Sequence, residues 1–247
     1  FDASKYADLD KLSESVRAEV IAAMKAGLVQ GIKTDAEPYE FGVGMSMRRY
    51  QMALLIARAD LKKAGETGDA AELDAILVEK YGTETPFTDL GNRADAAKAA
   101  IAYCLDKGYM KGVSDTEFNP NGNLSRQEAA VAMARVAGLS DENKDVSMFK
   151  DGDKIANWAK GYVRAAYDAG LVNGLDNGNF GPTQNILRQH AVCLFTRAFL
   201  DEDGNIKDPD DGDEPSNPDD GDEPSNPDDG DEPSNPDEGD EPSNPDE

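Results

Sequence analysis

The stretch Gly112–Val136, GVSDTEFNPNGNLSRQEAAVAMARV, decides the fold because a related stretch begins sixty-two residues later. The second copy, GLDNGNFGPTQNILRQHAVCLFTRAF, starts at Gly174. Each copy begins as a loop rich in Gly, Asn, Asp and Pro and continues as an amphipathic helical pattern. Arg126 and Arg188 hold the same position, fourteen residues after the opening glycine. One residue type at a fixed spacing predicts tandem copies of a structural unit.

A more divergent third copy precedes these two. Each copy opens with an aromatic residue, one further residue and an Asp, and reaches a Gly nineteen positions later and a second Gly four positions after that. The first copy departs once, with four extra residues in its loop. The shared positions are Asp8, Asp89 and Asp151, then Gly31, Gly112 and Gly174, then Arg49, Arg126 and Arg188. Spacings kept in triplicate predict three repeats.

Two helices are expected in each repeat. The apolar residues of the first helix recur at i, i+3 and i+4, and this helix stops at a Gly suited to a left-handed terminator. In repeat two the second helix starts near Ser125, which forms a capping box with Glu128. An additional helix, capped by Asp69, is expected between repeats one and two. One hairpin cannot bury both its faces, so we predict an all-α, pseudo-threefold bundle of helix–loop–helix repeats.

The predicted boundaries follow the repeats and a change of composition near the end of the chain. After Lys207 a nine-residue unit, DDGDEPSNP, recurs without any aromatic or aliphatic side chain. Such a segment cannot offset the entropy of ordering, so a disordered acidic linker or tail is expected. The segments are 1–60 for repeat one, 61–85 for the connecting helix, 86–139 for repeat two, 140–203 for repeat three and 204–247 for the tail.

Charge and composition exclude several classes of function. The net charge is −25, and the tail from Asp208 holds 19 of the 50 acidic residues and no Lys or Arg. A chain of this charge disfavours nucleic acid and anionic membranes, and no apolar run approaches the roughly 20 residues of a membrane span. No metal-binding spacing, cofactor motif or nucleophile–base pair is found, so no enzyme activity is expected. Cys104 and Cys193 are interpreted as buried free thiols or as a disulfide between repeats.

The repeats resemble the S-layer homology domain over roughly residues 6 to 200. The resemblance is carried by FTDL followed by AIAYCLDKGYMKGVSDTEFNPNGNLSRQEAAVAMAR, and by FKDG followed by WAKGYVRAAYDAGLVNGLDNGNFGPTQNILRQHAVCLFTR. It implies a secreted protein anchored non-covalently to a Gram-positive-type cell wall. The implied ligand is a secondary cell wall polysaccharide, often pyruvylated, bound in grooves between neighbouring repeats. The family's Thr-Arg-Ala-Glu motif reads RRYQ at 48–51, SRQE at 125–128 and LRQH at 187–190.

The repeated Arg has a chemistry that suits such a ligand. Arg binds a carboxylate two-pronged, and a helix N-terminus adds N–H groups suited to anions. Glycines let a sugar approach the backbone, and Trp158 offers a surface for stacking on a pyranose. The candidate ligand-binding residues are Arg49, Arg126, Arg188, Asp8, Asp89, Asp151, Gly31, Gly112, Gly174, Trp158, Ser125 and Glu128. Alternatively, the Arg residues brace the bundle, the Asp residues cap their helices, the Gly residues form turns and Trp158 belongs to the core.

Three functional interpretations follow. The first is a wall-polysaccharide anchor, in which repeat two contributes most because it keeps Ser125, Arg126 and Glu128 together. The second is a structural subunit whose partners are other copies in a surface layer or filament. The third is the targeting module of a larger extracellular enzyme that continues past Glu247.

Overall fold

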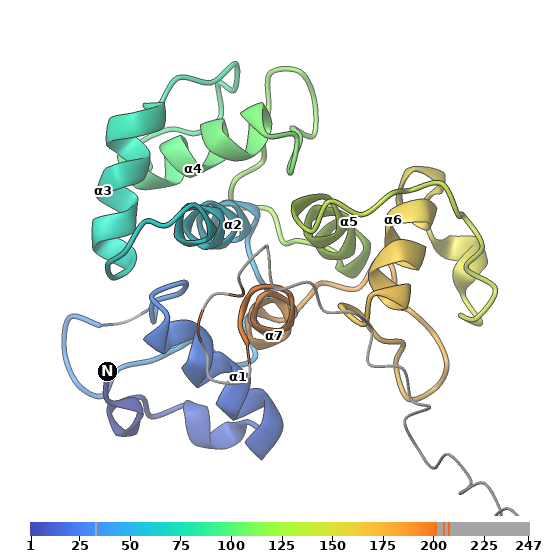
Figure 1. The fold of residues 1–247 in the computed structure, drawn as a ribbon, viewed down its shortest axis with the longest axis horizontal. Helices are drawn as coiled ribbons and strands as arrows, with labels where there is room; N and C mark the ends of the chain where they lie inside the picture. Colours follow the sequence, from blue (N-terminus) through green and yellow to red (C-terminus); the bar gives the residue numbers. More distant parts are fainter. Residues whose placement is uncertain (33, 202–204, 206, 208–247) are drawn as a thin grey trace, which may run out of the picture. The chain divides into compact units, whose positions relative to one another are not determined.

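In a computed structural model of the chain, residues 1–32, 34–201, 205 and 207 are described (Figure 1). Within these residues the regular structure is helical and contains no strand, which confirms the all-α prediction. The expected disordered tail lies, apart from residues 205 and 207, outside the described residues. The α-helices are α1 Glu14–Lys25, α2 Arg49–Lys63, α3 Ala70–Tyr81, α4 Asp95–Asp106, α5 Arg126–Val136, α6 Asn157–Asp168 and α7 Arg188–Phe199.

Local sequence signals set the helix ends. The first helices α1, α4 and α6 are each followed by a glycine in the left-handed region, Gly27, Gly108 and Gly170, with φ of 73°, 72° and 69°. A side chain at these positions would be strained, so the predicted terminators are confirmed. The capping box of α5 is also present: the Ser125 hydroxyl accepts from the Glu128 N–H, and the Glu128 carboxylate accepts from the Ser125 N–H.

The capping box of α3 supports a direct test. The Asp69 carboxylate accepts the N–H groups of Ala71 and Glu72 at 2.8 and 3.0 Å. Asp69→Ala leaves these N–H groups to water and should lower the free energy of unfolding by about 1 kcal/mol, measured by chemical denaturation. Glu79→Ala, an exposed change on the same helix, should be close to neutral. Equal losses in the two variants would contradict the capping assignment.

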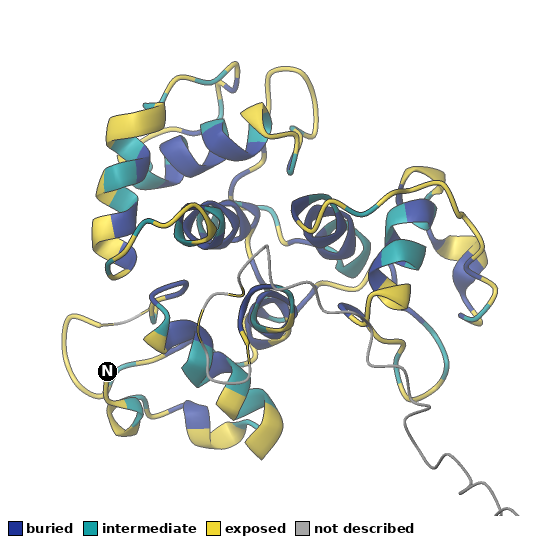
Figure 2. Cartoon of the chain, viewed as in Figure 1, coloured by how far each residue is buried: buried dark blue, intermediate teal, exposed yellow. Residues whose placement is uncertain are grey.

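The helices pair across the repeats. The first helix of each repeat packs against the second helix of the preceding repeat: α4 on α2, α6 on α5, and α1 on α7 (Figure 1). The buried faces of these helices meet in the interior (Figure 2). Because α7 of repeat three packs against α1 of repeat one, the three repeats close into a ring.

The ring has a backbone centre. Just before the second helices, the N–H of Met47 donates to the Ile186 carbonyl at 2.9 Å, that of Leu124 to the Met47 carbonyl at 2.8 Å, and that of Ile186 to the Leu124 carbonyl at 2.9 Å. All three residues are buried, so these groups need protein partners. Each repeat thus accepts a backbone hydrogen bond from the next, and the three hydrogen bonds form a closed triangle with pseudo-threefold symmetry.

The connecting helix and the cysteines belong to the same unit, Phe1–Asp211. Helix α3, the additional helix expected between repeats one and two, packs against α4 and α2, with Leu73 and Leu77 fully buried. Cys104 and Cys193 are buried free thiols. The alternative of a disulfide between repeats is therefore wrong.

Candidate functional site

Each repeated Arg reaches into the loop of the next repeat. Its Nε donates to the carbonyl of a buried Phe, and its guanidinium lies over the ring of that Phe, about 5 Å from the centroid. The Arg of repeat three reaches the loop of repeat one, so these contacts also close the ring. The Nε–O distances are 2.8 Å for Arg49 and Phe118, 2.9 Å for Arg126 and Phe180, and 3.0 Å for Arg188 and Phe41.

A second contact fixes each guanidinium. The Nη2 group donates to a carbonyl at the start of the same loop, at 2.6 Å for Arg49 and Lys111, 3.1 Å for Arg126 and Asn173, and 2.6 Å for Arg188 and Gln30. Burial lowers the pKa of all three guanidinium groups, that of Arg188 to about 10. They remain charged at neutral pH. The three arginines therefore connect neighbouring repeats, and they lie at the surfaces where those repeats meet.

The repeated Asp binds the same Phe as the repeated Arg: its carboxylate accepts the backbone N–H of that Phe, whereas the Arg donates to the carbonyl. Asp8 accepts the N–H groups of Phe41, Gly42 and Val43 at 2.7 to 2.8 Å. Asp89 does the same for Phe118 and Asn119, and Asp151 for Phe180 and Gly181. The alternative that these residues cap the first helices is wrong. Helices α1, α4 and α6 begin six residues later, at 14, 95 and 157, and the carboxylates are already taken by the loop.

The second repeated Gly makes room for the repeated aromatic ring. None of Gly31, Gly112 and Gly174 has a left-handed φ. A Cβ on Gly112 would lie 2.5 Å from Cε1 of Phe87 and 2.3 Å from the Ser114 carbonyl oxygen. Added Cβ atoms at the other two glycines would meet Tyr6 and Phe149 at 2.8 and 3.2 Å. Close packing of the loop explains these glycines.

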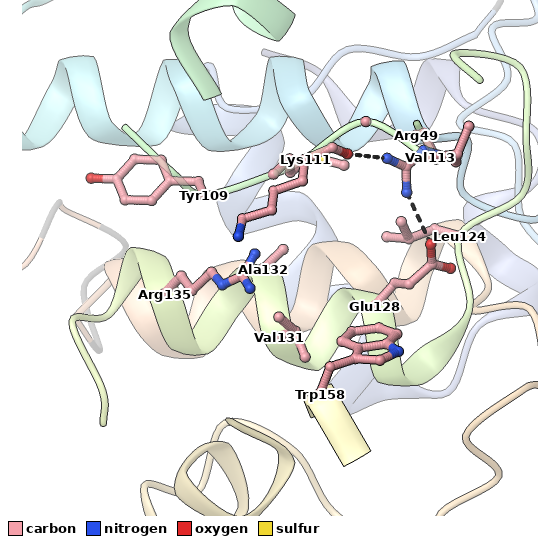
Figure 3. A pocket seen from close by; sticks show the side chains of 12 residues that line it. Arg49, Tyr109, Lys111, Val113, Leu124, Glu128, Val131, Ala132, Arg135 and Trp158 are labelled. Atoms are coloured by element: carbon pink, nitrogen blue, oxygen red, sulfur yellow. Dashed lines mark hydrogen bonds and ion pairs between the residues drawn. The ribbon is translucent and has the colours of Figure 1, made fainter. Parts of the chain in front are cut away.

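A groove of about 480 Å³ lies between repeats one and two, and we call it the one–two groove (Figure 3). Arg49 forms its inner end and pairs with Glu128 at 2.9 Å. The exposed indole of Trp158, from α6, stands at the wall opposite the loop. The remaining lining residues come from the loop after α4 and from α5: Tyr109, Met110, Lys111, Gly112, Val113, Leu124, Val131, Ala132 and Arg135.

The same positions one repeat later line a smaller groove of about 240 Å³, the two–three groove. It contains Arg126, Asn173, Gly174, His190 and Arg197. The pKa of His190 is lowered by burial and by the nearby Arg126 and Arg197. Polar groups of two different repeats therefore meet in each groove.

Ser125, Arg126 and Glu128, which are adjacent in the sequence motif, have different places in the structure. Arg126 lies in the two–three groove, whereas Glu128 lies in the one–two groove and Ser125 caps the helix between them. Lys111, Arg135 and Arg197 also line these grooves and are not among the residues predicted from the sequence. A signal for Arg135 and Arg197 was present, since an Arg recurs nine residues after each motif Arg.

Among the described residues, no helix is long and apolar enough to cross a membrane, and no group of His, Cys, Asp and Glu is placed to hold a metal ion.

Comparison with known proteins gives family matches in repeats two and three. Residues 86–130 and 149–192 match the family described as the S-layer homology domain. The chain is 30% identical over 209 residues to the surface-layer 125 kDa protein of Lysinibacillus sphaericus, covering 83% of this chain and 16% of that protein. It is 32% identical over 121 residues to an endoglucanase of Bacillus sp. (strain KSM-635), covering 49% and 12%. It is 33% identical over 118 residues to S-layer protein EA1 of Bacillus anthracis, covering 47% and 13%. The chain spans less than a fifth of the length of each relative.

Proposed function

This chain belongs to the S-layer homology family, and on that premise we propose that its repeats anchor a surface protein to the bacterial cell wall. The ligand in this proposal is a secondary cell wall polysaccharide with carboxylate substituents, such as pyruvate ketals. The protein is secreted and held outside a Gram-positive-type cell.

The observation that carries the proposal is the composition of the one–two groove. It combines a cationic wall, Lys111 and Arg135, with an exposed Trp158 and a volume of about 480 Å³. Ligand pockets commonly have volumes of about 300–1,000 Å³. A cation recognises the carboxylate, and an indole ring presents an apolar face on which a pyranose stacks. These are the requirements of an anionic sugar.

The residues selected from the sequence have two roles in this proposal. Trp158 and Glu128 face the open groove and contact the sugar. Ser125, the arginines of the motif, the repeated Asp residues and the repeated Gly residues support the groove by holding the loop and the helix start in place. Binding is therefore assigned to residues at the groove surface, and the motif keeps that surface in shape.

The named relatives support anchoring over catalysis for this segment. Two are surface-layer proteins and one is an endoglucanase, yet each is similar to this chain over part of its length. Because proteins with such different names share this module, we infer that it holds each of them at the cell surface. We assign no catalytic residue to this chain.

A second candidate is that the chain belongs to a surface-layer subunit that binds other copies of itself. The match to the Lysinibacillus surface-layer protein, which covers 83% of this chain, favours this candidate. The two candidates are compatible, because a lattice subunit also needs an anchor. Ordered assemblies formed by the purified chain without wall material would support self-association.

Co-sedimentation with cell wall sacculi tests anchoring. The full chain should sediment with sacculi that retain their secondary polysaccharide and should stay in the supernatant with sacculi from which it has been extracted. A peptide of residues 208–247 should not sediment with either, because its charge is purely acidic. Equal sedimentation with intact and extracted sacculi, or none with intact sacculi, would contradict the proposal.

A further inference from the structure

The junction between repeat three and repeat one differs from the other two junctions in how the chain connects its helices. The backbone runs on from α2 through α3 to α4, and from α5 to α6, so a connecting segment joins each of these pairs in addition to their packing. Helices α7 and α1 also lie side by side, although they come from opposite ends of the folded unit (Figure 1). Within the described residues, non-covalent contacts alone close the ring.

The contacts across this junction do not depend on chain connection. Arg188 binds the loop of repeat one through the same two carbonyl contacts that the motif Arg makes at each of the other junctions. The Thr196 hydroxyl donates to the Glu19 carbonyl at 3.0 Å, and the Arg197 Nη2 group lies 3.2 Å from a carboxylate oxygen of Glu19. Each contact joins a group on α7 to a group in repeat one, and none requires the two groups to belong to the same copy of the chain.

Residues 1–43 hold themselves together, and we call them the α1 segment. The Asp8 carboxylate accepts the N–H groups at the end of this segment, as described above. The N–H of Ala7 donates to the Tyr39 carbonyl at 3.0 Å, and the N–H of Tyr39 donates to the Lys5 carbonyl at 2.9 Å. Because these contacts lie within the segment, they persist when the segment leaves α7.

The α1 segment also contacts α2 and the start of α3. Arg58, whose guanidinium binds the Asp74 carboxylate at 2.7 and 2.8 Å, donates through Nη1 to the Leu28 carbonyl at 3.4 Å. Gly27 lies against the residues before α3, where an added Cβ would meet the Gly68 carbonyl oxygen at 3.1 Å. A second copy whose own α1 segment has left presents the same surfaces of α2, α3 and α7. Exchange between copies therefore re-forms the contacts that it breaks.

A glycine follows the α1 segment at once and suits a hinge. Gly44 is exposed and left-handed, with a φ of 81°, and a Cβ built on it would meet nothing within 4 Å. The residues at this position in the other repeats, five before the motif Arg, are Asn121 and Thr183, and neither has a positive φ. Met47 belongs to the closed triangle of backbone hydrogen bonds, so the chain is fixed again there. The direction of the chain can change at residues 44–46.

We propose that the α1 segment exchanges between copies of this chain, so that α1 of one copy packs on α7 of another. The surface of α7 that receives the segment is then an interaction surface, and its partner is a second copy of the same chain. Each copy gives one segment and receives one, so two copies close into a dimer and larger numbers form an open chain or a larger ring. The exchange needs no wall ligand and is independent of the anchoring function.

Protein concentration decides between the closed ring and the exchanged form. A segment on a short tether meets its own α7 at an effective concentration on the order of millimolar. Exchange between copies competes only as the protein concentration approaches that value. The dilute chain is therefore expected to be monomeric, and exchanged dimers should accumulate as the concentration rises.

Gly44→Ala tests the hinge. Alanine is strained at a left-handed φ in the closed monomer, and an extended hinge relieves that strain twice in each dimer, so the dimerisation constant should rise at least about 10-fold. It is measured by size-exclusion chromatography with light scattering over a concentration series. Gly138→Ala is the matched control, because Gly138 is also left-handed, with a φ of 68° and nothing within 4 Å of an added Cβ, but follows α5. Equal dimerisation constants in the two variants would overturn the proposal.

Charge reversal across the junction shows which segments pair. In the closed monomer Glu19→Arg places two cations opposite one another, and Arg197→Glu places two anions there. When the two variants are mixed, exchange brings each α1 onto an α7 of opposite charge. Heterodimers should then outnumber homodimers about 10-fold in native mass spectrometry, since repulsive pairs are replaced by attractive ones.

Arg164→Glu and Asp168→Arg form the control mixture. Arg164 and Asp168 make an ion pair within α6, so an exchange of α1 segments cannot restore it. This mixture should show no preference for heterodimers. A preference in both mixtures, or in neither, would contradict the pairing of α1 with α7 of another copy and would overturn the proposal.

Discussion

Replacing Arg188 with Ala is expected to lower the free energy of unfolding by about 3–5 kcal/mol. The residue is 5% exposed and joins repeat three to repeat one. Its truncation leaves the carbonyls of Phe41 and Gln30, now 3.0 and 2.6 Å from its nitrogens, without these donors and opens a cavity beside the Phe41 ring. An unsatisfied buried group costs about 1–3 kcal/mol, and the cavity adds to that cost.

Arg197→Ala is the matched control because it removes a guanidinium from the same helix. Its ion pair with Glu19 is partly exposed, so a loss below about 1 kcal/mol is expected. Both variants are compared by urea denaturation at pH 7. Similar midpoints for the two variants would mean that Arg188 does not brace the ring.

Asp8→Asn should lower the free energy of unfolding at pH 7 by about 2–4 kcal/mol. The carboxylate accepts three backbone N–H groups, and hydrogen bonds to charged groups are worth about 1.5–3 kcal/mol each. The amide of Asn has one acceptor oxygen and turns an NH2 group toward the remaining donors. The loop that receives Arg188 would then lose its support from within repeat one.

The effect should depend on pH in a defined direction. Burial by itself would raise the pKa of Asp8, but the N–H groups of Val43, Phe41 and Gly42 outweigh it and hold the pKa below its ordinary value. A lowered folded-state pKa gives stability that is complete above the unfolded-state pKa of about 4 and is lost as the pH falls through the folded-state value. The difference between wild type and Asp8→Asn should therefore shrink below about pH 4.

Asp10→Asn, an exposed change two residues away, controls for the loss of a surface charge. Its effect should stay small over the same pH range. A difference between wild type and Asp8→Asn that stays constant down to pH 2 would contradict the role of the Asp8 carboxylate.

Much of this fold follows from local patterns in the sequence. The repeat spacing predicts three units, and the apolar period predicts their helices. Ser125, Asp69 and the terminating glycines act on N–H and carbonyl groups within a few residues of themselves. Such interactions join residues that are close in the sequence, so they can be predicted without a structure.

The roles of the repeated polar residues needed the tertiary structure. Asp8 stands a few residues before a helix, which suggests a cap, but its partners are more than thirty residues away in the loop. Arg126 and Glu128 are neighbours in the motif, yet they point into different grooves because successive positions on a helix face different directions. A motif records which residues are kept together in the chain, not which surface each one faces.

By itself the sequence determined the repeats, the helix boundaries and the Arg at each second helix start, because these depend on spacing and on contacts within one turn. Only the tertiary structure decided that each first helix packs on the preceding repeat, that the ring closes from repeat three to repeat one, and that Asp74 reaches Arg58 while Arg135 is left open to the groove. These outcomes depend on contacts between groups that are far apart in the sequence, such as the pairing of a given guanidinium group with a given carboxylate. They are settled by where the backbone brings the groups and by the desolvation of charges that must then find partners.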